Sequence, residues 1–263
     1  MDAEILRALY QFTGSLAILG AILGINYYKK MGMGKDLIVA TLRGLTQLLI
    51  LSSILLLVFT QKGIIPLYGI LSIMILFAVQ TIAKRLDSLP DIFKVELVSI
   101  ATSVYLIMTT MTMLGVLSLE DAPMWIPIGG MVVGNSMNIT YLSTERFRSE
   151  LEKSRQSITT ALNLGISPNF IIDKLGTVST ALRVGITPST NNLRTLGIVF
   201  IPGLMTGLLI GGYNPLAAAL LQVMIFFLLI GGGLISSLIS ITLLKNHVID
   251  NETMTLNYLG KEQ

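Results

Sequence analysis

Long apolar runs constrain this chain more than any other feature of its sequence. Residues 220–244 read LLQVMIFFLLIGGGLISSLISITLL and carry no charge. A helix that crosses a bilayer needs about 20 mostly apolar residues, because the hydrocarbon core is about 30 Å thick. Seven runs meet or approach this length, at 9–28, 37–59, 64–83, 95–117, 125–142, 196–213 and 216–244. We therefore predict an all-α, multi-pass membrane protein with about seven transmembrane helices.

The composition excludes several classes of protein. Apolar residues make up 52% of the chain and charged residues only 13%, against about 25% charged in an average soluble domain. A disordered chain, a nucleic-acid-binding module and an ordinary soluble enzyme are therefore excluded. The chain has no cysteine and a single histidine, His247. Disulfides, thiolate metal sites and histidine-ligated catalytic metals are excluded in turn.

Lysine and arginine predict the orientation, because loops on the cytoplasmic side of a membrane are enriched in both. Alternate connections carry Lys29, Lys30 and Lys35; Lys84, Arg85 and Lys94; Arg146, Arg148, Lys153, Arg155, Lys174, Arg183 and Arg194; and Lys245 and Lys261. The other side carries only Arg7 and Lys62. This predicts an N-terminus outside and a cytoplasmic C-terminus. Asp2 and Glu4 precede the first run, so we expect that helix to be retained rather than cleaved as a signal peptide.

The segment 143–195 is a long stretch between the fifth and sixth runs and contains a short repeat. TTALNLGISP at 159–168 is echoed by STALRVGITP at 179–188. Each copy is typical of a helix end followed by a helix start, which predicts helices at 144–164 and 168–184. The residues that suit these ends are Gly165 and Gly185 at left-handed C′ positions, Ser167 and Thr187 at N-caps, and Pro168 and Pro188 at first helical positions. The repeat either marks ordinary helix ends and starts or forms a short capped helix that a partner protein pushes.

Polar residues inside predicted spans are candidates for a substrate pathway. They are Arg43 and Gln47 in the second run, Asn135 and Asn138 in the fifth, Thr206 in the sixth and Gln222 in the seventh. The alternative is hydrogen bonding between helices, worth about 0.6 kcal/mol on average in membranes. Arg43 could instead reach the membrane interface with its charge. No Asp or Glu lies near a predicted midplane, and we expect Glu96 at a cytoplasmic helix end. Carriers coupled to protons or sodium are therefore disfavoured.

Small residues at four-residue spacing let helices approach closely in lipid. Gly203, Gly207 and Gly211 have this spacing in the sixth run, and Gly130 and Gly134 in the fifth. These glycines pack helices within one bundle or form an interface between two protomers. The chain also has 13 methionines. Thioethers bind soft metals, but methionine is more often pliable filling of the core.

Two glycine-rich elements stand out: IPIGGMVVGNSMNITYL at 126–142 and GIVFIPGLMTGLLIGGYNPLAAALLQ at 197–222, with LNLGISP between them. Together they resemble the FetB-type permease family, which has plant relatives linked to aluminium tolerance. Ile201 replaces the leucine of the family's second element, and Arg43 and Gln47 also fit. The matching positions are Gly130, Met131, Gly134, Asn135 and Met137, and then Pro202, Gly203, Met205, Thr206 and Gly207.

The resemblance implies a transporter subunit rather than an enzyme. The whole chain, 1–263, would be one transmembrane permease domain in the cell membrane, working as a homodimer with separate cytoplasmic ABC ATPase subunits. ATP would be used by that partner, and this chain would bind no cofactor. The implied cargo is a metal ion such as iron, moved outward, although the metal-binding residues are unknown. The implied coupling region is 159–170, with candidates Thr159, Ala161, Gly165, Ser167 and Pro168.

The chain departs from the family in two places. Thr159 stands where the family tends to have an acidic residue, which bears on ATPase docking. Ser189, Thr190, Asn191 and Asn192 stand where the family tends to have aspartate, which bears on the cargo. Two alternatives therefore stay open: a self-contained channel or secondary carrier, and a non-transporting membrane scaffold.

Overall fold

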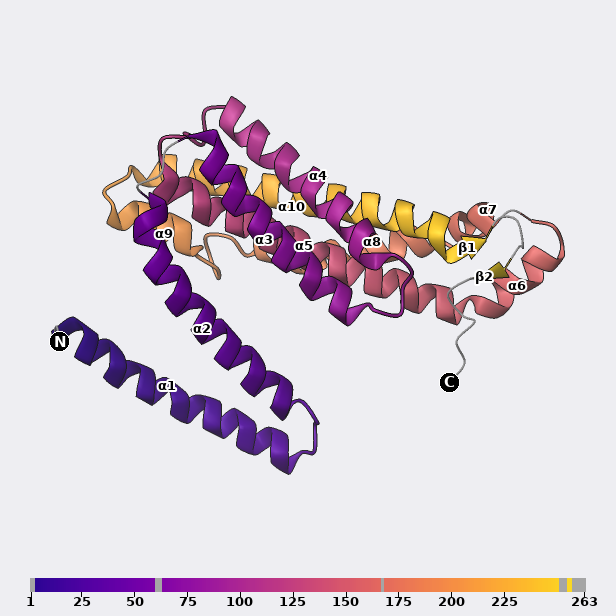
Figure 1. Ribbon diagram of the computed structural model, residues 1–263, viewed down its shortest axis with the longest axis horizontal. Coiled ribbons are helices and arrows are strands. Elements are labelled where there is room, and N and C mark those ends of the chain that lie inside the picture. The colour runs from indigo at the N-terminus through magenta and orange to yellow at the C-terminus, as the bar shows by residue number, and fades with distance from the viewer. Residues whose placement is uncertain (1–2, 60–62, 167, 251–254, 257–263) are drawn as a thin grey trace. The chain divides into compact units, whose positions relative to one another are not determined.

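The computed structural model describes residues 3–59, 63–166, 168–250 and 255–256, and nearly all of them are helical (Figure 1). Two two-residue strands, β1 (Ile249–Asp250) and β2 (Thr255–Leu256), pair antiparallel. The chain divides into two compact units, residues 1–60 and 61–263. The helices are α1 (Ala3–Tyr28), α2 (Gly34–Phe59), α3 (Ile64–Arg85), α4 (Ile92–Met113), α5 (Ala122–Lys153), α6 (Arg155–Asn163), α7 (Pro168–Lys174), α8 (Thr177–Arg194), α9 (Gly203–Ile210) and α10 (Pro215–Val248). The predicted helical class is confirmed, apart from the short strand pair.

The first unit is a pair of helices joined by a tight turn. Lys30 and Gly32 adopt positive φ angles in this turn. The side chain of Asn26 accepts a hydrogen bond from the Met33 backbone N–H at 3.2 Å. Most described side chains of α1 and α2 are exposed within the unit, including many apolar ones. Lipid or other protein surfaces are the natural neighbours of such side chains.

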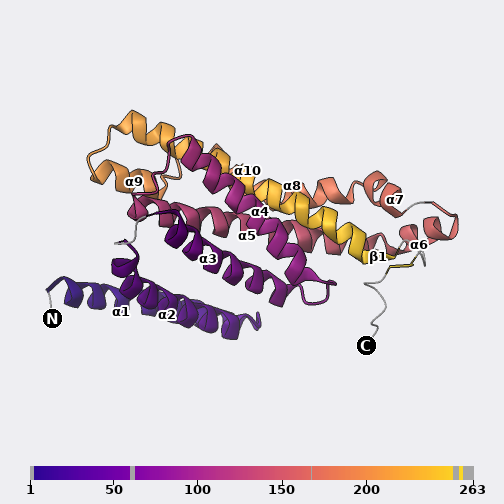
Figure 2. The same ribbon diagram turned by 45° about the horizontal axis from the view of Figure 1, so that its top comes forward.

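The second unit is a helical bundle built around α5. This helix packs against α3, α4, α8 and α10 (Figures 1 and 2). Trp125 and Phe147, both on α5, are fully buried. Tyr68 on α3 lies against the Trp125 ring, with 5.3 Å between ring centroids.

Four helices of the described residues are long and apolar enough to cross a membrane. They are Gly34–Ser53, Ile64–Arg85, Ile92–Met113 and Pro215–His247. The fifth predicted span, 125–142, lies within the 32-residue helix α5, whose asparagines and charged C-terminal turns lower its hydropathy. Multiple apolar helices of spanning length confirm a multi-pass membrane protein.

The sixth predicted span is not one continuous helix. Within 196–213 the only described helix is α9, whose eight residues are about 12 Å long. Gly197 has φ +83, and the N–H groups of Val199 and Phe200 turn back to the Thr195 carbonyl. Pro202 supplies no N–H and disfavours helix in the residue before it. The prediction of a helix from 196 is therefore wrong, because glycine and proline interrupt an apolar sequence.

The two copies of the repeat fold differently. The first copy ends α6 as predicted: Gly165 has φ +74, and the Ile166 N–H donates to the Ala161 carbonyl at 3.0 Å, as in a Schellman motif. The second copy lies inside α8, which continues through Gly185 and Pro188. The predicted helix ending at 184 is therefore wrong.

The predicted helix at 144–164 is also wrong as one element. Its first part is the end of α5, and α6 begins after Ser154. Between α7 and α8 the chain turns at Gly176, which has φ +66. Helix α8 then runs back along α5 and α10, and α9 follows beside the start of α10 (Figures 1 and 2). In place of the predicted span, the unit thus has an interrupted element: α8, the coil 195–202, and α9.

Candidate functional site

A pocket of about 300 Å³ lies where α5, α8 and α10 meet. It is bounded by amide and hydroxyl groups on one side and by apolar side chains on the other. Its lining residues are Met131, Gly134, Asn135 and Asn138 from α5, Ser189 and Asn192 from α8, and Phe226, Leu229 and Ile230 from α10. Two of the predicted pathway residues, Asn135 and Asn138, are therefore brought together here.

Asn135 ties the three helices of the pocket together. Its Nδ2 donates to the Leu229 backbone carbonyl of α10 at 2.7 Å. Its Oδ1 accepts from the Ser189 hydroxyl of α8 at 3.0 Å. Ser189 is buried, whereas Asn138 and Asn192 are exposed. Asn135 thus fixes the pocket, and the two exposed amides are available to a ligand.

The chemistry of this pocket is neutral. Its polar lining consists of asparagine amides and one serine hydroxyl. Amide carbonyl oxygens are ligands for hard cations, whereas a thioether such as that of Met131 suits softer ones. Across the part of the chain that the structure describes, no three His, Asp or Glu side chains gather closely enough to hold a metal ion together. A cation in this pocket would therefore meet neutral oxygen ligands and one thioether.

The other predicted pathway residues lie elsewhere. Gln222 is buried, and its Oε1 accepts from the Met205 backbone N–H at 3.2 Å, which joins α10 to α9. Thr206 is exposed and donates to the Pro202 carbonyl at 3.3 Å. Arg43 and Gln47 are exposed side chains on α2, in the first unit.

The glycines named from the sequence make few close contacts. A Cβ on Gly203, Gly207 or Gly134 would meet no atom within 4 Å, and a Cβ on Gly211 would meet only backbone oxygens of its own helix. At Gly130 it would lie 2.9 Å from Met74 Cε. Packing of these glycines against a second protomer stays a prediction.

Close helix approach occurs instead at glycines that the sequence reasoning did not use in this way. A Cβ on Gly185 would lie 2.8 Å from the Ile139 carbonyl oxygen of α5. A Cβ on Gly233 would lie 2.9 Å from Ile139 Cβ, and one on Gly232 would lie 3.1 Å from Ile107 Cγ1. In the sequence, the three consecutive glycines at 231–233 could have indicated the close approach at Gly232 and Gly233.

The predicted coupling region, 159–170, includes the end of α6 and the start of α7. Thr159 is exposed on α6, and its hydroxyl donates to the Arg155 carbonyl at 2.9 Å. The Ala161 carbonyl and Gly165 end that helix, and Pro168 begins α7 as predicted. Ser167 lies outside the described residues. Three apolar side chains in this part of the chain are exposed: Leu164, Ile166 and Phe170.

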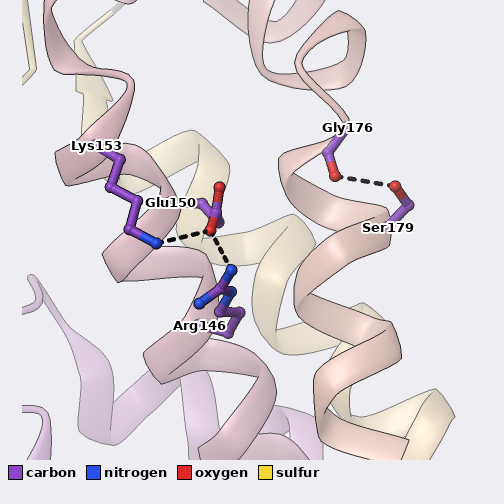
Figure 3. Close-up of polar contacts among 5 residues, drawn as sticks. All are labelled: Arg146, Glu150, Lys153, Gly176 and Ser179. Carbon is purple, nitrogen blue, oxygen red and sulfur yellow. Dashed lines mark hydrogen bonds and ion pairs between the residues drawn. The ribbon is translucent and has the colours of Figure 1, made fainter.

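Two ion pairs at the end of α5 and a turn hydrogen bond at the start of α8 lie in the helices that flank α6 and α7 (Figure 3). At the end of α5, Glu150 pairs with Arg146 at 2.6 Å and with Lys153 at 3.5 Å. At the start of α8, the Ser179 hydroxyl donates to the Gly176 carbonyl at 2.9 Å. Each of these contacts lies within one helix or its cap.

The burial of Glu96 was not predicted from the sequence, which placed this residue at a cytoplasmic helix end. It lies in the second turn of α4 and is fully buried. Its Oε1 accepts from Ser240 at 2.7 Å and from Thr144 at 3.3 Å. Ser99 and Ser103 follow on the same face of α4 and are also buried. The sequence signal for this burial was an acidic residue followed by serines three and seven residues later, which places all three on one face of a helix.

Residues 9–249 match the family described as "Uncharacterised protein family (UPF0014)". The chain belongs to UPF0014. It is 33% identical to UPF0014 membrane protein YjkA of Bacillus subtilis, over 75% of this chain and 78% of that protein. No solved structure matches.

Two other relatives confirm the resemblance to FetB-type permeases and their plant relatives. "Probable iron export permease protein FetB" of Escherichia coli is 27% identical, over 82% of each chain. UPF0014 membrane protein STAR2 of Oryza sativa is 28% identical, over 90% of this chain and 82% of that protein. This UPF0014 protein is thus a multi-pass membrane protein related to a permease.

Proposed function

We propose that this UPF0014 protein is the membrane-spanning permease subunit of an ABC transporter that exports a metal ion such as iron. A separate ATPase subunit supplies the energy, and two copies of this chain form the translocation path. The relative named as an iron export permease supports the cargo and its direction. The metal is cargo in this proposal, not a resident cofactor.

The single observation that carries the proposal is the neutral pocket beside the interrupted element formed by α8, the coil 195–202 and α9. Discontinuous helices near the middle of the bilayer are a recurrent way to build transport sites, because their ends leave backbone groups free for a substrate. Here α8 ends at Arg194 and α9 begins at Gly203. Ser189 and Asn192, near the end of α8, line the pocket.

We propose that the predicted orientation holds, with Arg183 and Arg194 of α8 inside the interrupted crossing rather than in a cytoplasmic connection. With α8, the coil and α9 counted as one crossing, the chain crosses seven times, with the N-terminus outside. Because the chain has no cysteine, this topology can be tested by introducing single cysteines. We expect Thr159→Cys to react with a membrane-impermeant maleimide only from the cytoplasm, and Glu120→Cys only from outside. Labelling of both from one side would contradict the topology.

The ATPase partnership is tested by co-purification. This chain alone is tagged and expressed with the ATPase encoded beside it, and ATP hydrolysis is then measured with and without Fe(II), Fe(III) and Cu(I). We expect the ATPase to co-purify and one metal to change its rate of ATP hydrolysis.

Leu164→Asp should weaken co-purification, because it places a charge on the exposed apolar surface of the coupling region. Glu120→Asp, at an exposed loop position, is the matched control. Failure of the untagged ATPase to co-purify would contradict the ABC assignment.

Glu96 favours a second candidate, a carrier that works without ATP. Ionisable groups inside membrane bundles commonly relay protons or bind coupling ions. ATP dependence separates the two: a carrier transports metal at the same rate when the ATPase is absent.

A further inference from the structure

Polar side chains fill part of the seam between α4, α5 and α10. Thr140 on α5 lies 2.6 Å from Ser236 on α10, measured between hydroxyl oxygens. One turn further, Thr144 lies 3.1 Å from Ser240. All four are fully buried. The second pair contacts Glu96, so the two successive pairs of hydroxyl groups lead to a carboxyl group.

The hydrogen bonds of Glu96 reach only one of its two carboxyl oxygens. Oε1 lies 2.7 Å from Ser240 Oγ and 3.3 Å from Thr144 Oγ1, and the two hydroxyls also contact each other. Both hydroxyl protons can therefore be donated to Oε1, which leaves the other carboxyl oxygen without a donor. Oε2 is buried and has no hydrogen-bond partner among the described residues.

The helices around Glu96 carry several charged groups at the same end of the bundle as Glu96. These groups contact residues other than Glu96 or are exposed. On α5, Arg148 donates to Ser88 and Glu145. On α4 itself, Lys94 pairs with Asp91. The remaining groups are Arg85 of α3 over the Tyr141 ring, exposed Lys84 of α3, Arg146 of α5 with Glu150, Lys245 of α10 with Asp173, and His247 Nδ1 of α10 near the Leu243 carbonyl.

We propose that Glu96 is a proton-binding site that carries a proton in this conformation and exchanges it during transport. An ionised carboxylate with no cation beside it is costly inside a bundle, and protonation removes that cost. When the seam between α4, α5 and α10 opens, water reaches the carboxyl group and accepts its proton. Closure restores the protonated form. The exchange during transport rests on the proposed function, whereas the bound proton does not.

Infrared spectroscopy of the purified chain in nanodiscs tests the bound proton directly. At neutral pH we expect the C=O band of a protonated carboxyl, shifted to lower wavenumber in D2O. Glu96→Gln should abolish the band, and Glu120→Gln, at an exposed loop position, should retain it. Ser240→Ala should move the band to higher wavenumber, because the carboxyl group loses a hydrogen bond. A band that survives Glu96→Gln, is absent from the wild type, or is lost on adding sodium at constant pH would overturn the proposal.

Transport in proteoliposomes tests the exchange. With the ATPase present, wild type and Glu120→Gln should export metal at rates that change with pH. Glu96→Gln should lose this pH dependence. If Glu96→Gln keeps the wild-type pH profile, the exchange is wrong. If the wild type moves no metal at any pH, the proposed function fails, while the infrared band still decides whether Glu96 holds a proton.

Discussion

Gly185→Ala tests the packing of α8 into the bundle, on which the pocket depends. The added methyl group would lie 2.8 Å from the Ile139 carbonyl oxygen and 3.2 Å from Ser143 Cβ, and it would also collide with Ser143 Oγ. The serine hydroxyl can rotate away. The carbonyl oxygen belongs to the α5 backbone, so it retreats only if the two helices separate.

The expected loss of stability follows from two opposing effects. Overpacking a well-packed contact costs about 1–3 kcal/mol, and a fixed backbone atom places this contact toward the upper end. Alanine stabilises a helix interior by about 1 kcal/mol relative to glycine. We therefore expect Gly185→Ala to lower the free energy of unfolding by about 2 kcal/mol.

The assay is reversible unfolding in mixed micelles, followed by the fluorescence of Trp125, which is buried and is the one tryptophan of the chain. Gly69→Ala is the control, because a Cβ at this position of α3 would meet nothing within 4 Å. It should be neutral or slightly stabilising. Combining Gly185→Ala with Ser143→Ala should recover only part of the loss. Equal stability of Gly185→Ala and Gly69→Ala would refute this packing of α8.

Three further predictions concern polar contacts of the second unit. Asn135→Ala removes two inter-helix hydrogen bonds and should lower the unfolding free energy by about 1 kcal/mol, yet abolish metal export in proteoliposomes; export at the wild-type rate would contradict its role in the pocket. A double-mutant cycle of Thr140→Ala and Ser236→Ala, measured by unfolding, should give a coupling energy of about 0.6 kcal/mol, and zero coupling would mean that the hydroxyls are not bonded. Asp173→Asn removes an ion pair with Lys245 in which Asp173 is 63% exposed; melting curves should show a loss below about 1 kcal/mol that vanishes in high salt, and a larger loss would indicate a buried role.

The sequence was sufficient for the helical class and for six helices that lie at predicted spans. Hydropathy alone extended the sixth span across Gly197 and Pro202, because a transfer scale records how apolar a residue is and ignores its backbone geometry. The φ angle of Gly197 and the missing N–H of Pro202 break the helix there. The apolar residues around the break remain exposed in the chain, where lipid or another protein surface can cover them.

The repeat shows a second limit of local sequence. Gly165 and Gly185 stand in nearly the same local sequence, yet one ends a helix and the other lies inside one. The difference comes from tertiary packing, because α5 lies against Gly185 and no local rule contains α5. Asn135 and Asn138 could be identified because polarity within an apolar run is visible in sequence. Ser189, which bonds Asn135 from α8, was indicated only by the family resemblance, because the apolar runs placed its segment between two predicted spans.

ATP-dependent metal export is the most direct test of the proposed function. The chain and its ATPase are reconstituted into vesicles in which the ATPase faces the bath, and iron uptake is followed with ATP, with a non-hydrolysable analogue, and without the ATPase. We predict uptake only with ATP and the ATPase together. Equal uptake in all three conditions would show a carrier that needs no ATP, and uptake in none would contradict metal export.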